Sequence, residues 1–139
     1  MTVHGHCLCG QAAFSIEAQP LTARICWCRD CQYLSGGTGL AGLAFPSAAL
    51  TTTGAISWFR STADSGNLME RGFCPSCGTP LFSRTEARPQ LVFVRIGALD
   101  DPELLAPQMA IWTKSAPSWA CISPGLPQVA GQPSPPVVK

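Results

Sequence analysis

Short β-strands are predicted along the chain by the alternation of hydrophobic and polar residues. Residues 11–17 alternate in this way, which places Phe14 and Ile16 on one face of a strand. Similar apolar or alternating runs are bounded by Gly, Pro, Ser or Thr, and they cover residues 40–45, 56–60, 68–73, 79–83 and 91–96. Because each run has about the usual length of a strand, the pattern predicts a mainly β fold.

Helical periodicity is confined to brief segments. Residues 47–50 follow Pro46, and residues 103–106 follow Asp101-Pro102, which suits the cap and first turn of a helix. We therefore expect only short helical turns.

Composition predicts one domain followed by a tail. The chain has 139 residues, of which 12% are charged, and it contains 13 Gly and 13 Pro, a balance that fits turn-rich β structure. We expect a single domain over residues 1–121. Residues 122–139 form a Pro-rich C-terminal segment with almost no apolar alternation, and we expect this tail to wrap loosely or to fray.

Charge and hydropathy argue against several classes of partner. The net charge of +1 leaves neither a basic footprint for nucleic acid nor an acidic interaction tail. No stretch approaches the roughly 18 consecutive apolar residues of a membrane span, and residues 1–4 lack the layout of a signal peptide. We therefore expect a cytoplasmic protein that binds neither nucleic acid nor membrane.

Seven of the eight cysteines fall into three tight clusters, which are Cys7 with Cys9, Cys26 with Cys28 and Cys31, and Cys74 with Cys77. Two thiolates separated by one or two residues can bind one zinc ion, because the backbone between them turns back on itself. The two outer pairs together supply the four ligands of a closed, structural site. The triplet supplies three ligands and leaves a fourth position open, as in catalytic zinc sites. The sequence thus predicts two zinc ions per chain.

Two other uses of the cysteines compete with zinc binding. A secreted scaffold of disulfides is disfavoured by the missing signal peptide and by the chain length. Separate redox Cys-x-x-Cys pairs would explain neither the first pair nor the triplet. Cys121 lies outside every cluster and is expected to be a buried, small hydrophobic residue, and His6 is expected to be a bystander.

The motifs around these cysteines resemble those of a known family. They are Cys7-Leu8-Cys9-Gly10, Cys26-Trp27-Cys28-Arg29-Asp30-Cys31-Gln32 with Ser35-Gly36, and Phe73-Cys74-Pro75-Ser76-Cys77-Gly78-Thr79-Pro80-Leu81-Phe82. The similarity extends through residues 95–101 and 111–116. Over roughly residues 5–120, the chain is similar to the glutathione-dependent formaldehyde-activating (GFA) family, which includes centromere protein V.

The resemblance implies a β-tent fold of antiparallel sheets with two zinc sites, one held by the outer cysteine pairs and one by the triplet. It also implies carbon–sulfur lyase chemistry, in which glutathione condenses reversibly with formaldehyde to S-(hydroxymethyl)glutathione. We therefore expect an enzyme that acts on adducts of glutathione, or of a similar thiol, with formaldehyde or another small aldehyde. The thiolate would attack the carbonyl carbon at the zinc held by Cys26, Cys28 and Cys31.

Substrate contacts are expected near the triplet, because glutathione carries two carboxylates that need cationic or N–H partners. The candidates are Trp27, Arg29, Ser35, Gly36, Trp112 and Lys114, with Arg24 and Arg71 as further nearby cations. The turn at Ser35-Gly36-Gly37 could be a nest for a carboxylate or, more commonly, a tight turn. Trp27 stands where the family commonly carries His, so its indole bears on whether glutathione is the thiol. Core packing is the competing interpretation of Trp27.

A noncatalytic zinc-binding module with a protein or thiol-ligand role is the alternative to an enzyme. Such a module could lose the triplet without losing activity, whereas the enzyme needs a metal position with exchangeable coordination. Exposed sheet edges in a small β domain also allow a homodimer.

Overall fold

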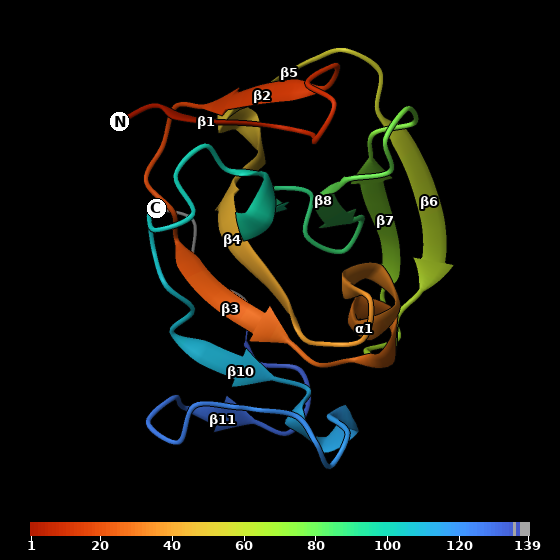
Figure 1. Ribbon diagram of the computed structural model, residues 1–139, viewed down its shortest axis with the longest axis vertical. Coiled ribbons are helices and arrows are strands. Elements are labelled where there is room, and N and C mark those ends of the chain that lie inside the picture. Colours follow the sequence, from red (N-terminus) through yellow and green to blue (C-terminus); the bar gives the residue numbers. More distant parts are fainter. Residues whose placement is uncertain (135, 137–139) are drawn as a thin grey trace.

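Two β-sheets form the fold of the computed structural model, which describes residues 1–134 and 136 (Figure 1). The smaller sheet is antiparallel, has the order β1–β2–β5, and lies at the top of the view in Figure 1. Its strands are β1 (Val3–His6), β2 (Ala13–Ile16) and β5 (Leu50–Thr53). Every second side chain of β1 and β2 is buried, because successive side chains of a strand point to opposite faces.

The larger sheet has eight strands in the order β11–β10–β3–β4–β9–β8–β7–β6. These strands are β3 (Thr22–Cys26), β4 (Leu40–Pro46), β6 (Ser57–Thr62), β7 (Leu68–Phe73), β8 (Pro80–Thr85), β9 (Leu91–Arg95), β10 (Met109–Ile111) and β11 (Gln128–Val129). From β3 to β6 each neighbouring pair is antiparallel. β10 is parallel to both β3 and β11, so this end of the sheet is mixed. The prediction of a mainly β fold is confirmed.

The alternation pattern located six of the strands. β7 has the predicted bounds, and the ends of β2, β4, β6, β8 and β9 differ from the prediction by one or two residues. The pattern missed β1, β3, β5, β10 and β11. Four of these five have four residues or fewer, which is too short for a period of two to stand out.

The C-terminal tail supplies the edge strand of the larger sheet. Gln128 and Val129 pair with Ala110 and Ile111 of β10. The expectation of a loose tail is therefore wrong for this segment, because backbone pairing that leaves no trace in the apolar pattern holds it in place. Residues 135 and 137–139 lie outside the described residues, and the domain boundary expected after residue 121 stays a prediction.

Helical structure is short. It consists of the helix α1 (Arg29–Ser35) and the 3-10 turns η1 (Ser47–Ala49), η2 (Ile96–Ala98) and η3 (Thr113–Ser115). η1 confirms the turn predicted over residues 47–50. Residues 103–106 form no helix, so that prediction was wrong. Asp101 Oδ1 accepts a hydrogen bond from the Glu103 N–H at 2.9 Å and closes only a turn.

Within the described part of the chain, no helix has the length and apolarity needed to cross a membrane.

Side chains from both sheets form the main hydrophobic core. The rings of Phe14 in β2 and Phe82 in β8 pack edge to face, with their centroids 5.2 Å apart. Gly5 in β1 lies against this pair, because a Cβ there would come within 2.2 Å of Phe14 Cζ. Cys7 and Cys74 are buried in the same core, so the two outer cysteine pairs are continuous with it.

The variant Phe82→Ala is expected to lower the free energy of unfolding by about 3–5 kcal/mol. The reason is that Phe82 is 1% exposed and its ring packs against both Phe14 and Trp58. Chemical denaturation would measure the loss. The matched control is Phe59→Ala on β6, which removes a side chain that is 62% exposed and should change stability by less than about 0.5 kcal/mol. Equal losses at the two positions would contradict this core.

Candidate metal centres and their pocket

Two tight turns bring together Cys7, Cys9, Cys74 and Cys77, which form the first cluster. Cys7 and Cys9 lie on the turn between β1 and β2, and Cys74 and Cys77 lie on the turn between β7 and β8. Each turn ends in a glycine with left-handed backbone, Gly10 at φ 80° and Gly78 at φ 79°, a conformation that other residues adopt at a cost. In both turns the glycine N–H donates to the carbonyl oxygen of the first cysteine, at 3.0 and 2.8 Å.

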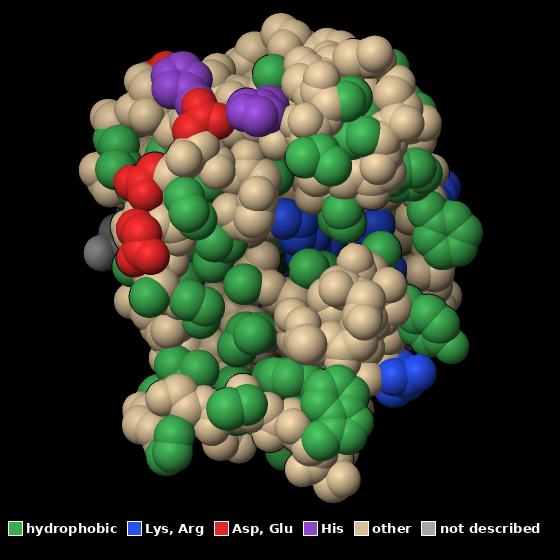
Figure 2. Space-filling model, in the orientation of Figure 1, with side chains coloured by type: hydrophobic (Ala, Val, Ile, Leu, Met, Phe, Trp, Pro, Cys, Tyr) green, Lys and Arg blue, Asp and Glu red, His purple; other side chains and the backbone are tan. Residues whose placement is uncertain are grey.

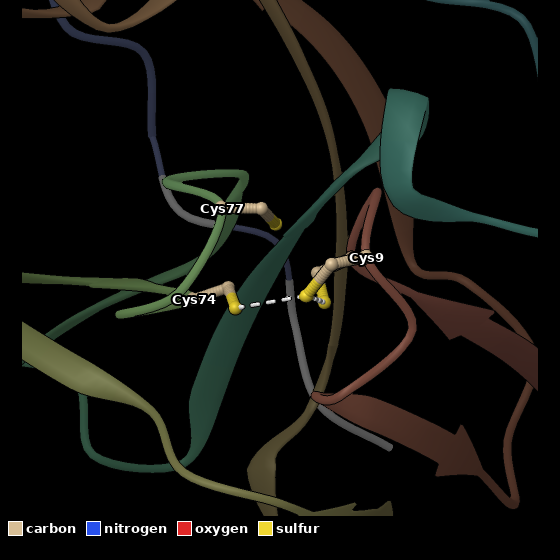
Figure 3. A group of neighbouring side chains, drawn as sticks. Cys9, Cys74 and Cys77 are labelled. Atoms are coloured by element: carbon tan, nitrogen blue, oxygen red, sulfur yellow. Dashed lines mark hydrogen bonds between the residues drawn. The ribbon is translucent and has the colours of Figure 1, made fainter.

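The four sulfurs have the spacing of a tetrahedral metal site. The Sγ atoms of Cys7 and Cys9 are 3.5 Å apart, those of Cys9 and Cys74 are 3.8 Å apart, and all four lie within 4.8 Å of one another. Zinc–sulfur bonds of about 2.3 Å in a tetrahedron place sulfurs about 3.8 Å apart. Figure 3 shows the sulfurs of Cys9, Cys74 and Cys77 directed toward one another from the two turns. All eight cysteines, which lie within the described residues, are free thiols, so the disulfide scaffold does not apply.

Hydrogen bonds tie the two turns to each other. The Leu8 N–H donates to Thr79 Oγ1 at 3.0 Å, and Ser76 Oγ donates to Gln11 Oε1 at 2.8 Å. Thr79 Oγ1 also lies 3.2 Å from Cys77 Sγ, and this hydrogen bond, together with N–H donors of the backbone, lowers the pKa of Cys77 to about 5. The turns are therefore held in register by contacts beyond the sulfurs themselves.

His6 and Cys121 lie outside both clusters. His6 Nδ1 lies 2.7 Å from the carbonyl oxygen of Cys7, and its Nε2 lies 3.6 Å from Asp100 Oδ1. These partners agree with the expected bystander role. Cys121 is exposed, within a segment of residues 116–127 that has neither helix nor strand, so the expectation of a buried cysteine was wrong.

The second cluster forms where β3 leads into α1. Cys26 is the last residue of β3, Cys28 is the N-cap of α1, and Cys31 lies in its first turn. Cys28 Sγ accepts a hydrogen bond from the Cys31 N–H at 3.4 Å, so the sulfur itself caps the helix. The three Sγ atoms lie within 4.8 Å of one another, and among the described residues no His, Asp, Glu or further Cys joins them at this distance.

Apolar packing and one buried glutamine hold the second cluster in place. Its two buried cysteines pack with Ile111 and Trp112. Gln32 of α1, which is 5% exposed, donates through Nε2 to the carbonyl oxygens of Trp27 at 2.8 Å and Ser115 at 3.0 Å. Trp112 has φ 56°, a left-handed backbone that a bulky residue adopts only when its surroundings impose it.

Hydrogen bonding separates the acidities of the three thiols. The thiols of Cys26 and Cys31 donate toward Cys28 and lower the pKa of Cys28. The pKa of Cys26 is raised, because its proton is shared with Cys28 and Cys31 and because burial disfavours its charge. The Cys28 sulfur therefore carries negative charge most readily.

A pocket opens at the second cluster. Cys26, Cys28 and Cys31 line it, and its cavity volume is about 90 Å³, with further space open to solvent at the mouth. The larger sheet supplies much of the lining through every second residue of its strands, including Arg24 on β3, Gly42 on β4, and Phe93 and Arg95 on β9. Val92 and Val94, between these positions on β9, belong to the main core. One face of the sheet thus packs the core, and the other presents the pocket.

Five of the seven arginines in the chain line this pocket, namely Arg24, Arg71, Arg84, Arg88 and Arg95. One acidic residue, Asp64, also lines the pocket, so positive charge is concentrated at this site although the net charge of the chain is only +1. Figure 2 shows Lys and Arg side chains recessed in a hollow near the centre of the face. Burial lowers the pKa of Arg24 and Arg95, and the cysteine sulfurs oppose part of this effect. Both guanidinium groups remain charged, because the ordinary pKa of Arg is so high.

Two of these arginines have carboxylate partners. Arg71 Nη2 lies 3.4 Å from Asp30 Oδ2, and Arg84 Nη2 lies 3.3 Å from Glu70 Oε2. Arg71 also donates from Nη1 to Ser61 Oγ at 2.9 Å. The other three arginines of the pocket have no ion pair within the described part of the chain.

The structure brings only some of the expected substrate contacts to the pocket. Trp112, Arg24 and Arg71 line it. Trp27 does not, because its side chain is 3% exposed and packs in the interior. Arg29 and Lys114 also lie outside the lining, with Arg29 over the ring of Tyr33 and Lys114 over the ring of Trp112.

Ser35 and Gly36 end the helix and do not line the pocket. Gly36 has φ 87°, and its N–H donates to the Gln32 carbonyl oxygen at 3.1 Å. The Gly37 N–H donates to the same oxygen at 2.8 Å. Because both N–H groups are used, this segment has the tight-turn geometry rather than that of a carboxylate nest.

Arg84, Arg88 and Arg95 line the pocket but were not among the candidates from the sequence. Arg95 could have been found, because it follows Leu91 and Phe93 at steps of two on a predicted strand. No local pattern marks Arg84 or Arg88, since their place at the pocket depends on how β8 and the following turn meet the rest of the sheet.

Known proteins resemble this chain in sequence and in fold. A family model described as glutathione-dependent formaldehyde-activating enzyme matches residues 2–115. A crystal structure of a protein from Rhodobacter sphaeroides has a similar fold, with a TM-score of 0.59 and 18% sequence identity over 93% of this chain and 99% of that chain. At this identity the likeness concerns the fold alone.

No curated protein matches the chain. The family model, however, spans most of the sequence and includes every cysteine of both clusters. The chain therefore belongs to the glutathione-dependent formaldehyde-activating enzyme family.

Proposed function

We propose that this protein is a zinc-dependent enzyme of the carbon–sulfur lyase type, which joins a thiol such as glutathione to formaldehyde or another small aldehyde. One observation carries the proposal. Three cysteine sulfurs line a pocket, and no further His, Cys, Asp or Glu among the described residues completes their set. The first cluster has four sulfurs and does not line this pocket. This division suits one structural and one catalytic zinc ion.

The donor sets favour zinc. Cys7, Cys9, Cys74 and Cys77 would hold the structural ion, and Cys26, Cys28 and Cys31 would hold the catalytic ion. Clusters made only of thiols favour soft or borderline metals over magnesium and calcium, which prefer oxygen ligands. When bound at the second cluster, zinc would favour the deprotonated form of a substrate thiol.

The proposed reaction forms one carbon–sulfur bond. A sulfur lone pair of the thiolate adds to the aldehyde carbon, the carbonyl π electrons move to the oxygen, and that oxygen takes up a proton. The reverse reaction releases thiol and aldehyde, and neither direction needs an oxidant or reductant. The pocket contributes by holding both reactants at one place in a fixed orientation.

The chain's own residues suit an anionic thiol. Guanidinium groups around the pocket attract carboxylates such as the two of glutathione. Met69, Phe93, Ile111 and Trp112 supply apolar wall beside them. This apolar surface excludes water and strengthens the attraction between bound anion and arginine.

The variant Cys28→Ser is expected to lose one of two bound zinc ions and to lower thiol-dependent aldehyde turnover by about 100-fold or more, because it removes one of three ligands. Elemental analysis of purified protein and formaldehyde consumption with and without glutathione would measure the two effects. The matched control is Cys121→Ser, which changes an exposed thiol outside both clusters and should alter neither. Full turnover in Cys28→Ser would instead favour a noncatalytic role for the metal.

The variant Cys74→Ser is expected to impair folding before it impairs chemistry. Cys74 is 1% exposed and belongs both to the first cluster and to the main core. Because metal binding at such a site is coupled to folding, we expect the unfolding midpoint to fall by about 10 °C or more, or the protein to become insoluble. Thermal unfolding with zinc determination would test this. A soluble variant with an unchanged midpoint and two zinc ions would rule out the structural role.

A further inference from the structure

Two arginines and a glycine form one row across the floor of the pocket. Arg24 on β3 pairs with Gly42 on β4, and Gly42 in turn pairs with Arg95 on β9. All three residues line the pocket, so they share one face of the sheet. Since neighbouring strands are about 4.8 Å apart, the Cα atoms of the two arginines are about 10 Å apart.

The glycine leaves room beside the guanidinium group of Arg95. A Cβ added at Gly42 would lie 3.7 Å from Arg95 Nη1 and 3.4 Å from the Val94 carbonyl oxygen. Gly42 does not have a positive φ, so its backbone does not require glycine. The absence of a side chain here matters for space rather than for conformation.

Within the described residues, the guanidinium of Arg95 has no carboxylate or hydrogen-bond partner, and only the nearby cysteine sulfurs favour its charge. Arg95 is 8% exposed, and within the described residues it makes no ion pair, while its buried Nε has no hydrogen-bond acceptor. Arg71 is as deeply buried and its Nε also has no acceptor, but its Nη atoms have Asp30 and Ser61 as partners. A charged donor that is buried without a partner is costly, and such groups in native structures call for an explanation. A bound anion supplies one.

Arg24 lines the same pocket and is also free to bind an anion. Its guanidinium carbon lies 4.2 Å from the centre of the Phe93 ring, which holds the side chain without using its N–H donors. Within the described part of the chain it forms no ion pair. The two arginines flank Gly42 in this row, and guanidinium groups bind carboxylate oxygens through charge-assisted hydrogen bonds.

This row lies beside the second cysteine cluster. Cys26 follows Arg24 by two residues on β3 and lines the same pocket, so the two positions are separated by about 6.6 Å along the strand. A carboxylate bound between Arg24 and Arg95 therefore lies close to the carbon that reacts at the cluster. In glutathione, several bonds separate each carboxylate from the sulfur, and the more exposed Arg84 and Arg88 suit those groups better.

We propose that Arg24, Gly42 and Arg95 form a carboxylate subsite for the electrophile, so that the aldehyde of this enzyme carries a carboxylate next to its carbonyl group. The inference rests on the proposed function. The chemistry is unchanged: the thiolate sulfur bonds to the aldehyde carbon, the carbonyl oxygen takes up a proton, and the carboxylate keeps its charge throughout. Formaldehyde has a single carbon and no carboxylate, so it cannot bind between Arg24 and Arg95 in this way.

Glyoxylate, the simplest aldehyde of this class, is the probe. The zinc-loaded protein would be given glyoxylate or formaldehyde, each with glutathione and with uncharged 2-mercaptoethanol, and rates would be corrected for the uncatalysed reaction. We expect kcat/KM to favour glyoxylate with either thiol. Arg95→Met should lower the ratio of kcat/KM for glyoxylate to that for formaldehyde by about tenfold or more, because it removes charge-assisted hydrogen bonds to the carboxylate.

Two further variants sharpen the test. Gly42→Ala should lower the same ratio, because its methyl group fills the space beside Arg95. Arg60→Met is the matched control, since Arg60 is exposed, pairs with Glu86 and does not line the pocket, and it should leave the ratio unchanged. An unaltered ratio in Arg95→Met would overturn the inference. The inference would also be overturned if Arg95→Met lowered kcat/KM with glutathione but not with 2-mercaptoethanol, whichever aldehyde is used.

Binding of glycolate, which has the carboxylate but no carbonyl, separates this inference from the proposed function. Calorimetry should detect glycolate binding to the zinc-loaded protein and about tenfold weaker binding to Arg95→Met. If no aldehyde is turned over but this pattern holds, the enzyme proposal fails and the subsite stands. If formaldehyde is turned over and glycolate does not bind, the function stands and the subsite is wrong. Arg95→Met could instead lose zinc and lower kcat/KM equally for both aldehydes. Arg95 would then only balance the charge of the cysteine sulfurs, and the subsite would be wrong.

Discussion

The contact between two turns that lie far apart in the sequence is the constraint on which the rest of the structure depends. Cys9 and Cys74 are 65 residues apart, yet their sulfurs are 3.8 Å apart. One turn belongs to the smaller sheet and the other to the larger sheet, so their contact joins the two sheets around the main core. Closing so long a loop costs chain entropy, and a metal bound by the four sulfurs would offset that cost.

The pocket follows from the pleat of the larger sheet. Along β9, Val92 and Val94 face the core, whereas Phe93 and Arg95 face the pocket. A strand whose one face is held by the core has no freedom to shift its register by one residue, because the shift would exchange the two faces. The positions of the pocket residues are thus set by packing on the opposite side of the sheet.

Charge within the pocket is organised at two depths. Arg71 and Arg95 are buried, whereas Arg84 is exposed at the edge of the site. Cysteine sulfurs and arginines share the floor, so each can moderate the charge of the other, as the opposing effects on the pKa of Arg95 indicate. A site of this kind suits a reaction that begins with a negatively charged sulfur. The net charge of the whole chain reveals none of this, because its 8 acidic residues nearly balance its 9 basic residues.

Sequence alone determined the features that depend on local spacing. The interval between cysteines within each turn predicts a ligand pair, and a period of two in residues such as Phe14 and Ile16 predicts a strand. It also identified the family, because the motifs around the cysteines are contiguous in the chain. The sequence did not predict short strands such as β10 and β11, because pairing through the backbone needs no particular side chains.

Only the tertiary structure decided which side chains meet at the site. Arg24 and Arg95 are 71 residues apart, and their common row depends on β3 and β9 both pairing with β4. The tertiary structure also buries Trp27 in the interior. The N–H groups of Gly36 and Gly37 form hydrogen bonds that end the helix. The physical reason is that strand order and register arise from packing across the whole sheet, and no short segment of the chain carries that information.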